Sequence, residues 1–222
     1  MFTINTRKLI GFPKRKEDWA KARAIFSKHS LRIAGHPVME DWEKGYMNKL
    51  AKIAGSKHGR VLEVGYGMGL SAKAIQSNGV TDHFIIECHP DVVAKCVQDF
   101  HEAIGQNHLH IISGFWEEAT PLIAGETFDG ILFDTYPLTE EQIHANHFWF
   151  FKEAWRLLKP GGILTYYSDE ATGFSDKHLA KLEEAKFTRE NINFEIVNVN
   201  PPPNCEYWQD NTIVAPIVKK QF

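Results

Sequence analysis

The residues of this chain best suited to chemistry lie at the ends of two apolar runs. The first run ends at Val64 and is followed by the glycine-rich segment Gly65-Tyr66-Gly67-Met68-Gly69. The second run ends at an acidic residue, Glu87. Glycines let the backbone approach a ligand closely, and a helix that begins after them offers free N–H donors. A carboxylate at the tip of the next strand can accept both hydroxyl protons of a ribose. The pattern predicts a nucleoside pocket. The plainer interpretation is a tight strand-to-helix turn beside a surface glutamate.

The residues around these glycines favour one nucleoside cofactor over another. Their spacing is G-x-G-x-G, not the G-x-G-x-x-G of nicotinamide enzymes. Glu63 lies two residues before Gly65, where a pyrophosphate would be repelled by a carboxylate. S-adenosylmethionine has no phosphate and carries a sulfonium and an ammonium, so nearby acids suit it. We therefore expect S-adenosylmethionine as the cofactor, with Glu63 near its ammonium. A nicotinamide dehydrogenase is a much weaker alternative.

Two further acids lie where they could act on an acceptor. Asp134 follows the apolar run from Gly130 to Phe133, at the end of a strand where ligands of parallel sheets bind. Glu43 lies in residues 38–54, whose apolar positions have helical spacing, and it shares a side of that predicted helix with Glu40. Each acid also has a plainer interpretation, which is a turn or helix-capping role for Asp134 and a solvated helix face for Glu43.

These acids must be positioned by a sheet with helices on both faces. Helical patterns alternate with the first five apolar runs, which is typical of a parallel α/β sheet. The last two runs are joined by a proline-rich loop with no helix, so they must form an antiparallel hairpin. The expected fold is a Rossmann-like seven-stranded methyltransferase sheet with a reversed last strand. The predicted strands are residues 60–64, 83–87, 109–112, 128–134, 162–167, 193–199 and 211–218, and the predicted helices are residues 70–77, 91–101 and 143–158.

Length and composition set the broad class. A chain of 222 residues is large enough for one domain with a sizeable core. We expect an N-terminal arm or lid over residues 1–30 and a single methyltransferase domain over residues 31–222. The net charge of −3 gives no basic field for nucleic acid, and no apolar run is long enough to cross a membrane. Three cysteines without C-x-x-C pairing and histidines without ligand spacing predict a cytoplasmic protein with no metal site.

Several longer motifs resemble guanidinoacetate N-methyltransferase. They are Val38-Met39-Glu40-Asp41-Trp42-Glu43, Ile85-Ile86-Glu87-Cys88, Gly114-Phe115-Trp116-Glu117, Asp134-Thr135-Tyr136-Pro137-Leu138 and Leu157-Leu158-Lys159-Pro160-Gly161-Gly162. The resemblance covers roughly residues 30 to 167 closely and the rest more loosely. It implies an S-adenosylmethionine-dependent N-methyltransferase whose acceptor is a small guanidino compound, with guanidinoacetate converted to creatine. The product of the cofactor would be S-adenosylhomocysteine, and the protein would be a monomer or homodimer.

The resemblance also implies roles for individual residues. Glu43 and Asp134 would bind the guanidino group and act in catalysis, with Asp134 accepting a proton and Glu43 holding charge and orientation. Glu87 would bind the ribose, and Trp116 and Glu117 would flank the adenine. The remaining cofactor contacts would be Trp19, Met39, Met47, Glu63, Gly65, Gly67, Met68, Gly69, Leu70, Ser71, Ala72, Cys88 and Asp134.

One segment departs from the family. Where the family uses backbone amides to bind the substrate carboxylate, this chain places Asp169 and Glu170, which we take as candidate substrate-binding residues. Two anions beside a carboxylate are unfavourable, so we expect guanidinoacetate to bind more weakly than a less anionic guanidine. Two alternatives stay open: a methyltransferase for the guanidino group of free or protein-bound arginine, and a non-catalytic protein that binds S-adenosylmethionine.

Overall fold

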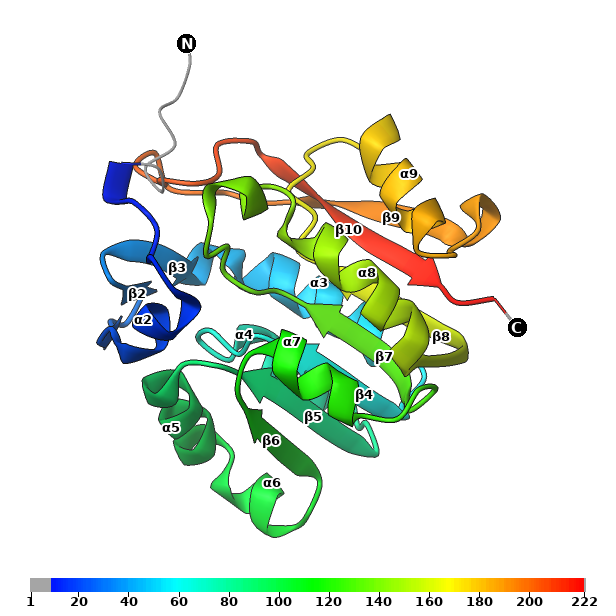
Figure 1. The fold of residues 1–222 in the computed structure, drawn as a ribbon, viewed down its shortest axis with the longest axis horizontal. Coiled ribbons are helices and arrows are strands. Elements are labelled where there is room, and N and C mark those ends of the chain that lie inside the picture. Colours follow the sequence, from blue (N-terminus) through cyan, green and yellow to red (C-terminus); the bar gives the residue numbers. More distant parts are fainter. Residues whose placement is uncertain (1–8, 222) are drawn as a thin grey trace.

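The computed structural model describes residues 9–221, and the first eight residues of the predicted arm lie outside this range. Its centre is a seven-stranded sheet in the order β6-β5-β4-β7-β8-β10-β9 (Figure 1). The five strands from β4 to β8 are mutually parallel, whereas β10 runs antiparallel to both of its neighbours. The strands are β4 (Arg60–Val64), β5 (Asp82–Glu87), β6 (Leu109–Ser113), β7 (Phe128–Phe133), β8 (Leu158–Tyr166), β9 (Ile192–Asn198) and β10 (Thr212–Lys219).

This sheet confirms the predicted fold class and its reversed last strand. Each predicted strand is present, with ends shifted by a few residues; the largest shift is in β8, which begins at Leu158 rather than Gly162. The proline-rich loop joins β9 to β10 as a hairpin, with Thr212 opposite Asn198. Among the described residues, no helix is long and apolar enough to cross a membrane.

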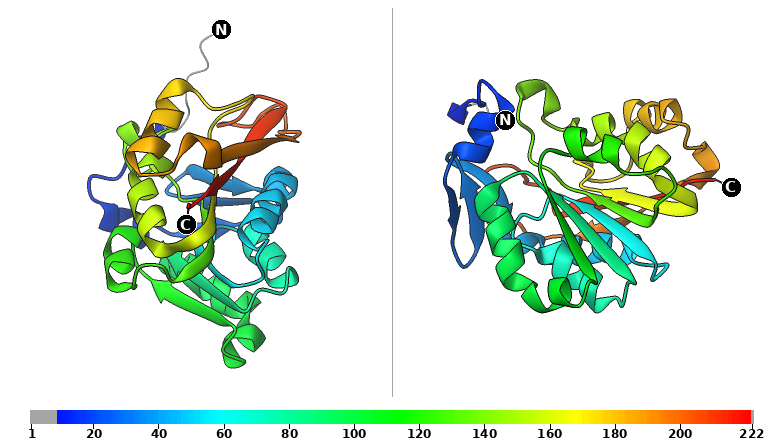
Figure 2. Two further views of the ribbon diagram at one scale, coloured as in Figure 1. Left: turned by 90° about the vertical axis from the view of Figure 1, so that its right-hand side faces the viewer. Right: turned by 60° about the horizontal axis from the view of Figure 1, so that its bottom comes forward.

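Helices cover both faces of the sheet (Figure 2). The side chains of β4 alternate, so that Leu62 packs with the cluster under α8 and α9 while Val61 packs with the cluster under α3. Because both faces are buried, the parallel strands read as nearly continuous apolar runs. The helices are α3 (Lys44–Ala54), α4 (Leu70–Ser77), α5 (Pro90–Asp99), α6 (His101–Gly105), α7 (Trp116–Ala119), α8 (Asn146–Leu157) and α9 (Asp176–Glu184), with short 3₁₀ turns η2 (Thr120–Leu122), η3 (Glu140–Gln142) and η4 (Arg189–Asn191).

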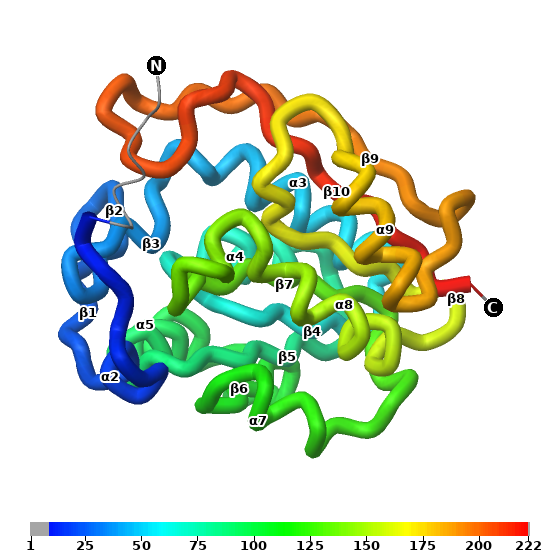
Figure 3. The backbone as a smooth tube through the Cα atoms, turned by 45° about the horizontal axis from the view of Figure 1, so that its top comes forward, coloured from blue at the N-terminus to red at the C-terminus, as the bar shows by residue number. Residues whose placement is uncertain are grey.

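The segment before the first parallel strand differs from the prediction. The expected helix over residues 38–54 begins only at Lys44, because residues 36–40 form a strand and residues 41–43 a 3₁₀ turn. Strands β1 (Ala24–Phe26), β2 (Ser30–Ile33) and β3 (His36–Glu40) make a three-stranded antiparallel sheet, which with α2 (Lys16–Lys21) lies beside the carboxyl ends of the central strands (Figure 3). The turn η1 (Asp41–Glu43) then redirects the chain into α3.

A single glycine tests how tightly α3 packs on the sheet. A Cβ added to Gly130 of β7 would lie 1.8 Å from the carbonyl oxygen of Ala54, the last residue of α3. Gly130→Ala should therefore reduce the free energy of unfolding by about 2–3 kcal/mol, because neither backbone can move without disturbing the core. Gly105→Ala is the matched control, since its Cβ would meet no atom within 4 Å. Urea unfolding followed by circular dichroism would measure both, and equal stability of the two variants would contradict this account.

Candidate functional site

A cavity opens at the carboxyl ends of β4, β5, β7 and β8, beside the small N-terminal sheet. Its walls come from segments far apart in the sequence, including α2, η1, α7 and the loops after β7 and β8. Many of the predicted site residues meet here: Trp19, Met39, Glu43, Gly65, Gly67, Glu87, Cys88, Trp116, Glu117, Asp134 and Asp169 all line it.

The glycines hold the floor of the cavity in a shape that other residues cannot adopt. Gly65 has a φ of +93°, and a Cβ there would lie 2.0 Å from the carbonyl oxygen of Asp134. Gly67 has a φ of +55°, and a Cβ there would lie 2.9 Å from the thioether of Met39. The backbones of the β4 and β7 ends can therefore touch only because Gly65 lacks a side chain, and Gly67 leaves space for Met39 of β3.

Glu87 is fixed at the end of β5 as the ribose role requires. Its carboxylate accepts hydrogen bonds from the backbone N–H of Tyr66 at 2.9 Å and of His89 at 2.8 Å. Burial raises the pKa of Glu87, and these two hydrogen bonds oppose that rise. The neighbouring Cys88 has its thiol pKa raised by burial, so it stays protonated and is a packing residue rather than a nucleophile.

Glu43 and Asp134 face the same cavity from different elements. Glu43 ends η1 and is 2 % exposed, and its Oε1 accepts hydrogen bonds from the Tyr207 hydroxyl at 2.5 Å and the Glu40 backbone N–H at 2.8 Å. Asp134 follows β7, where its N–H donates to the Val64 carbonyl at 2.9 Å. Burial, and then the charge of Asp134, raise the pKa of Glu43 to about 8.

Several predicted cofactor contacts lie behind the cavity rather than in its wall. Glu63 is fully buried, where its carboxylate accepts a hydrogen bond from Ser71 and lies 3.0 Å from His83. Met68 donates its N–H to the Met39 sulfur, and Gly69 precedes α4 with a φ of +71°. The structure thus does not bring the following predicted residues into the wall: Met47, Glu63, Met68, Gly69, Leu70, Ser71, Ala72 and Glu170.

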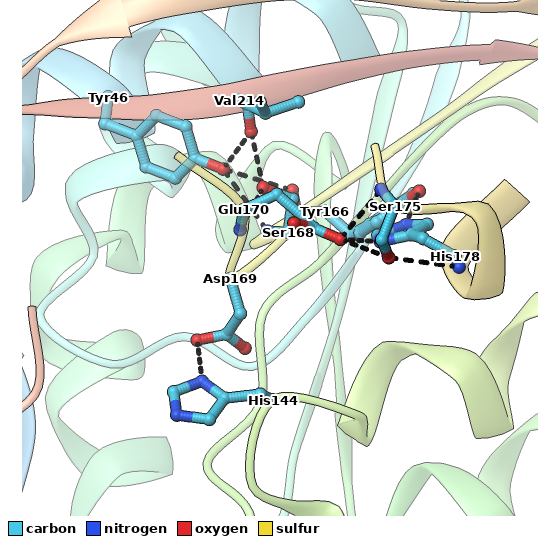
Figure 4. A network of polar contacts seen from close by, with 9 residues as sticks. All are labelled: Tyr46, His144, Tyr166, Ser168, Asp169, Glu170, Ser175, His178 and Val214. Atoms are coloured by element: carbon cyan, nitrogen blue, oxygen red, sulfur yellow. Dashed lines mark hydrogen bonds and ion pairs between the residues drawn. The ribbon is translucent and has the colours of Figure 1, made fainter. Parts of the chain in front are cut away.

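The loop after β8 separates the two acids that depart from the family. Asp169 faces the cavity, with its Oδ1 3.0 Å from Nδ1 of His144 (Figure 4). Glu170 instead accepts hydrogen bonds from the N–H and hydroxyl of Ser175 and lies 3.4 Å from Nδ1 of His178. Only one of the two anions therefore lines the cavity.

Hydrogen bonds on the other side of this loop hold it in place. The Tyr46 hydroxyl donates to the Val214 carbonyl at 2.9 Å, as does the Ser168 hydroxyl at 2.7 Å. The Tyr166 hydroxyl is 2.7 Å from Nε2 of His178 (Figure 4). Burial lowers the pKa of His178 to about 4, so its ring is neutral near pH 7. The loop is thus held against β10 and α9 on the side away from the cavity.

The N-terminal arm closes one side of the site. Trp19 is buried and stacks on Tyr136 with ring centroids 5.0 Å apart and planes 7° apart. Lys16 pairs with Glu118, which lies on α7, and its ammonium is 4.6 Å from the centre of the Phe115 ring. The arm therefore contacts both the loop after β7 and the α7 region.

The tyrosines and histidines of the cavity are not predicted from the sequence. Tyr207, Tyr167, His144 and His147 all line the cavity. Tyr207 lies in the β9–β10 loop, about 160 residues from the glutamate that it contacts, and nothing in its local sequence indicates this. The only local signal for His144 and His147 is a spacing of three residues, which does not by itself indicate a site.

The donors that line the cavity fit the expected cofactor. Five carboxylates line it, which suits a ligand with a sulfonium and an ammonium and would repel a pyrophosphate. Glu87, the predicted ribose ligand, and Trp116, the predicted adenine contact, both line the cavity. Residues 9–221 contain no group of three His, Cys, Asp or Glu side chains placed to hold a metal ion.

Comparison with known proteins gives relatives of two kinds. Protein arginine N-methyltransferase 2 of Kluyveromyces lactis is 29% identical over 185 residues, which are 78% of this chain and 43% of that protein. The protein of the same name from Emericella nidulans is 42% identical over 103 residues, 45% of this chain and 24% of its own length. This chain therefore spans less than half the length of these relatives. A spermidine synthase from Thermotoga maritima has the same fold, with a TM-score of 0.58, 15% identity, and coverage of 89% of this chain and 72% of its own.

A family model decides the assignment. The model described as guanidinoacetate N-methyltransferase matches residues 12–221, which include nearly the whole described chain and the entire cavity. Its cofactor is S-adenosylmethionine, in agreement with the donors that line the site. The chain belongs to the guanidinoacetate N-methyltransferase family.

Proposed function

We propose that this protein transfers a methyl group from S-adenosylmethionine to a nitrogen of a small guanidino compound. One observation carries the proposal: Glu43 and Asp134 face one cavity and lie close enough for the charge of Asp134 to raise the pKa of Glu43. Two carboxylates crowded together in a buried site are both ionised only when a cation lies between them, and otherwise one of them holds a proton. A planar guanidinium, with N–H groups on separate edges, satisfies both at once.

The two carboxylates then have different tasks. When bound, S-adenosylmethionine supplies an electrophilic methyl group on its sulfonium and leaves as the thioether S-adenosylhomocysteine. A guanidinium nitrogen is a poor nucleophile because its lone pair is delocalised, so the protein must orient it and remove a proton. Holding it in line can lower the barrier by several kcal/mol, up to about 7–11 in the best models. Asp134 accepts the proton as the N–C bond forms, and Glu43 keeps the remaining charge paired.

The buried hydrogen bonds support this division of roles. Glu43 is held by Tyr207 and by the Glu40 backbone, so it is fixed in orientation. Asp134 is fixed through its backbone beside Gly65, and it lines the same cavity as Glu43. Glu43 is not among the predicted cofactor contacts, so its place in the same cavity as Asp134 argues against a non-catalytic binding protein.

Two acceptors within this class have support. Guanidinoacetate, which would give creatine, is the acceptor in the description of the family. The guanidino group of arginine is the second candidate, because the relatives from Kluyveromyces lactis and Emericella nidulans are both described as arginine methyltransferases. Methyl-transfer assays with labelled S-adenosylmethionine on guanidinoacetate, arginine and a peptide that contains arginine would separate them. Tight cofactor binding without transfer to any guanidine would favour the non-catalytic alternative.

The role of Asp134 is tested by Asp134→Asn. We expect methyl transfer to fall by roughly 10²–10⁴-fold, because the amide cannot accept the proton. Calorimetry should show that S-adenosylmethionine still binds. Asp176→Asn, at an exposed acid at the start of α9, is the matched control and should leave the rate unchanged. Near-normal turnover in a variant that binds cofactor would rule out Asp134 as the base.

The raised pKa of Glu43 gives a prediction that does not depend on catalysis. From the ordinary pKa of 4.5 up to about 8, ligand-free folded protein holds a proton on Glu43 that the unfolded chain has released. Stability from this group is therefore fully present at low pH and is lost as the pH rises toward 8. Relative to Glu43→Gln, the free energy of unfolding of the parent should fall by roughly 3 kcal/mol between about pH 5.5 and pH 8.

Urea unfolding at these two pH values would measure this difference. Glu102→Gln serves as the control, because Glu102 lies exposed on α6 far from the site. The control should follow the parent at both pH values. A parent and a Glu43→Gln variant that change in parallel would show that Glu43 is already ionised in the ligand-free protein.

A further inference from the structure

We propose that Asp169, His144 and Tyr167 form a second subsite in the cavity, which binds the end of the guanidine remote from the methylated nitrogen. We infer that this subsite selects an ammonium or a similar hydrogen-bond donor over a carboxylate. The inference rests on the proposed function and adds to it the chemical class of the substrate tail.

The three residues stand in the wall that also carries Glu43 and Asp134. Tyr167 and Asp169 follow β8, and His144 lies in the loop before α8. These neighbouring strand ends place the Asp169–His144 pair beside the acids proposed to hold the guanidino group. The proposed subsite and the acids proposed to hold the guanidino group therefore line one cavity.

The backbone directs one acid into the cavity and its neighbour out of it. Asp169 has a φ of +55°, a conformation that an aspartate adopts at some cost. Its side chain is 15 % exposed and points toward His144, whereas Glu170 is held by Ser175 near His178 (Figure 4). The firm anchoring of Ser168 and Glu170 keeps Asp169 in this position, so its carboxylate is a fixed part of the cavity wall.

A buried hydroxyl in the same cavity wall is available to a ligand. Within the described part of the chain, the hydroxyl of Tyr167 is buried without a hydrogen-bond partner. Its ring packs edge-on against Tyr46, with centroids 5.3 Å apart and planes 83° apart, which fixes where the hydroxyl lies. A buried polar group without a partner is unfavourable, so a ligand that supplies a hydrogen bond gains affinity there.

The charges in the wall disfavour a carboxylate tail. Of the described residues that line the cavity, none is lysine or arginine. The imidazole of His144 already contacts Asp169 through Nδ1. A substrate carboxylate near this pair would meet another anion in a poorly solvated site, whereas an ammonium would be attracted to it.

The test compares acceptors that share the guanidino group and differ in the tail. We would measure methyl transfer to (2-aminoethyl)guanidine, guanidinoacetate and methylguanidine, the last of which has no tail. In the parent, kcat/KM for the amine should exceed that for guanidinoacetate by about tenfold or more. Asp169→Asn should remove most of this preference through a higher KM for the amine, and should leave methylguanidine within about twofold.

Two further variants keep the test decisive. Tyr167→Phe should raise KM for both tailed acceptors and spare methylguanidine, and it does so without removing a charge. Asp176→Asn, with the same chemical change outside the cavity, should leave every ratio as in the parent. Circular dichroism would confirm that each variant is folded.

The outcomes separate this inference from the proposed function. A parent that prefers guanidinoacetate to the amine, or an amine preference that survives Asp169→Asn, would overturn the subsite while the methyltransferase activity stands. If the protein binds S-adenosylmethionine but methylates none of the three acceptors, methylguanidine included, the proposed function is overturned and the subsite with it.

Discussion

The contact between Gly65 and the carbonyl of Asp134 is the constraint on which the rest of the site depends. It lies between β4 and β7, where the order of strands in the sheet changes direction and the connections on either side lead away from each other. The proposed cofactor residues Gly65 and Glu87 follow β4 and β5, and the proposed acceptor residues Asp134 and Asp169 follow β7 and β8. Because no side chain fits between Gly65 and Asp134, these two halves of the cavity meet closely.

The burial of an acidic residue, Glu43, in this cavity has a cost. Glu43 is buried at a cost that its two hydrogen bonds only partly offset, because its pKa stays raised. Buried charges are retained where a ligand completes the pairing. Tyr207, from the β9–β10 hairpin, is what fixes Glu43, so the antiparallel end of the sheet takes part in the site even though the cofactor half lies at the other end.

The sequence predicted the sheet well because a parallel sheet buried on both faces leaves long apolar runs. It predicted Gly65, Glu87 and Asp134 at the cavity because strand ends can be located from where those runs stop. The prediction failed for residues whose position depends on tertiary contacts rather than on where a strand ends. The predicted helix began at Val38 because Val38, Met39 and Trp42 fit helical spacing, yet pairing with β2 makes residues 36–40 a strand. Glu63 points to the face covered by α4, and Tyr207 arrives through tertiary folding alone.

The N-terminal arm bears on the size of the acceptor. Its contacts with Tyr136 and Glu118 join two sides of the cavity, and Trp19 itself forms part of the wall. Arginine in a polypeptide would bring its main chain to this rim and compete with the arm for the same surface. A free guanidine makes no such demand, since the proposed acceptor residues Glu43, Asp134 and Asp169 line the cavity with the arm in place. The arm and the acidic wall thus both support the proposal of a small guanidine without a negative tail as the acceptor.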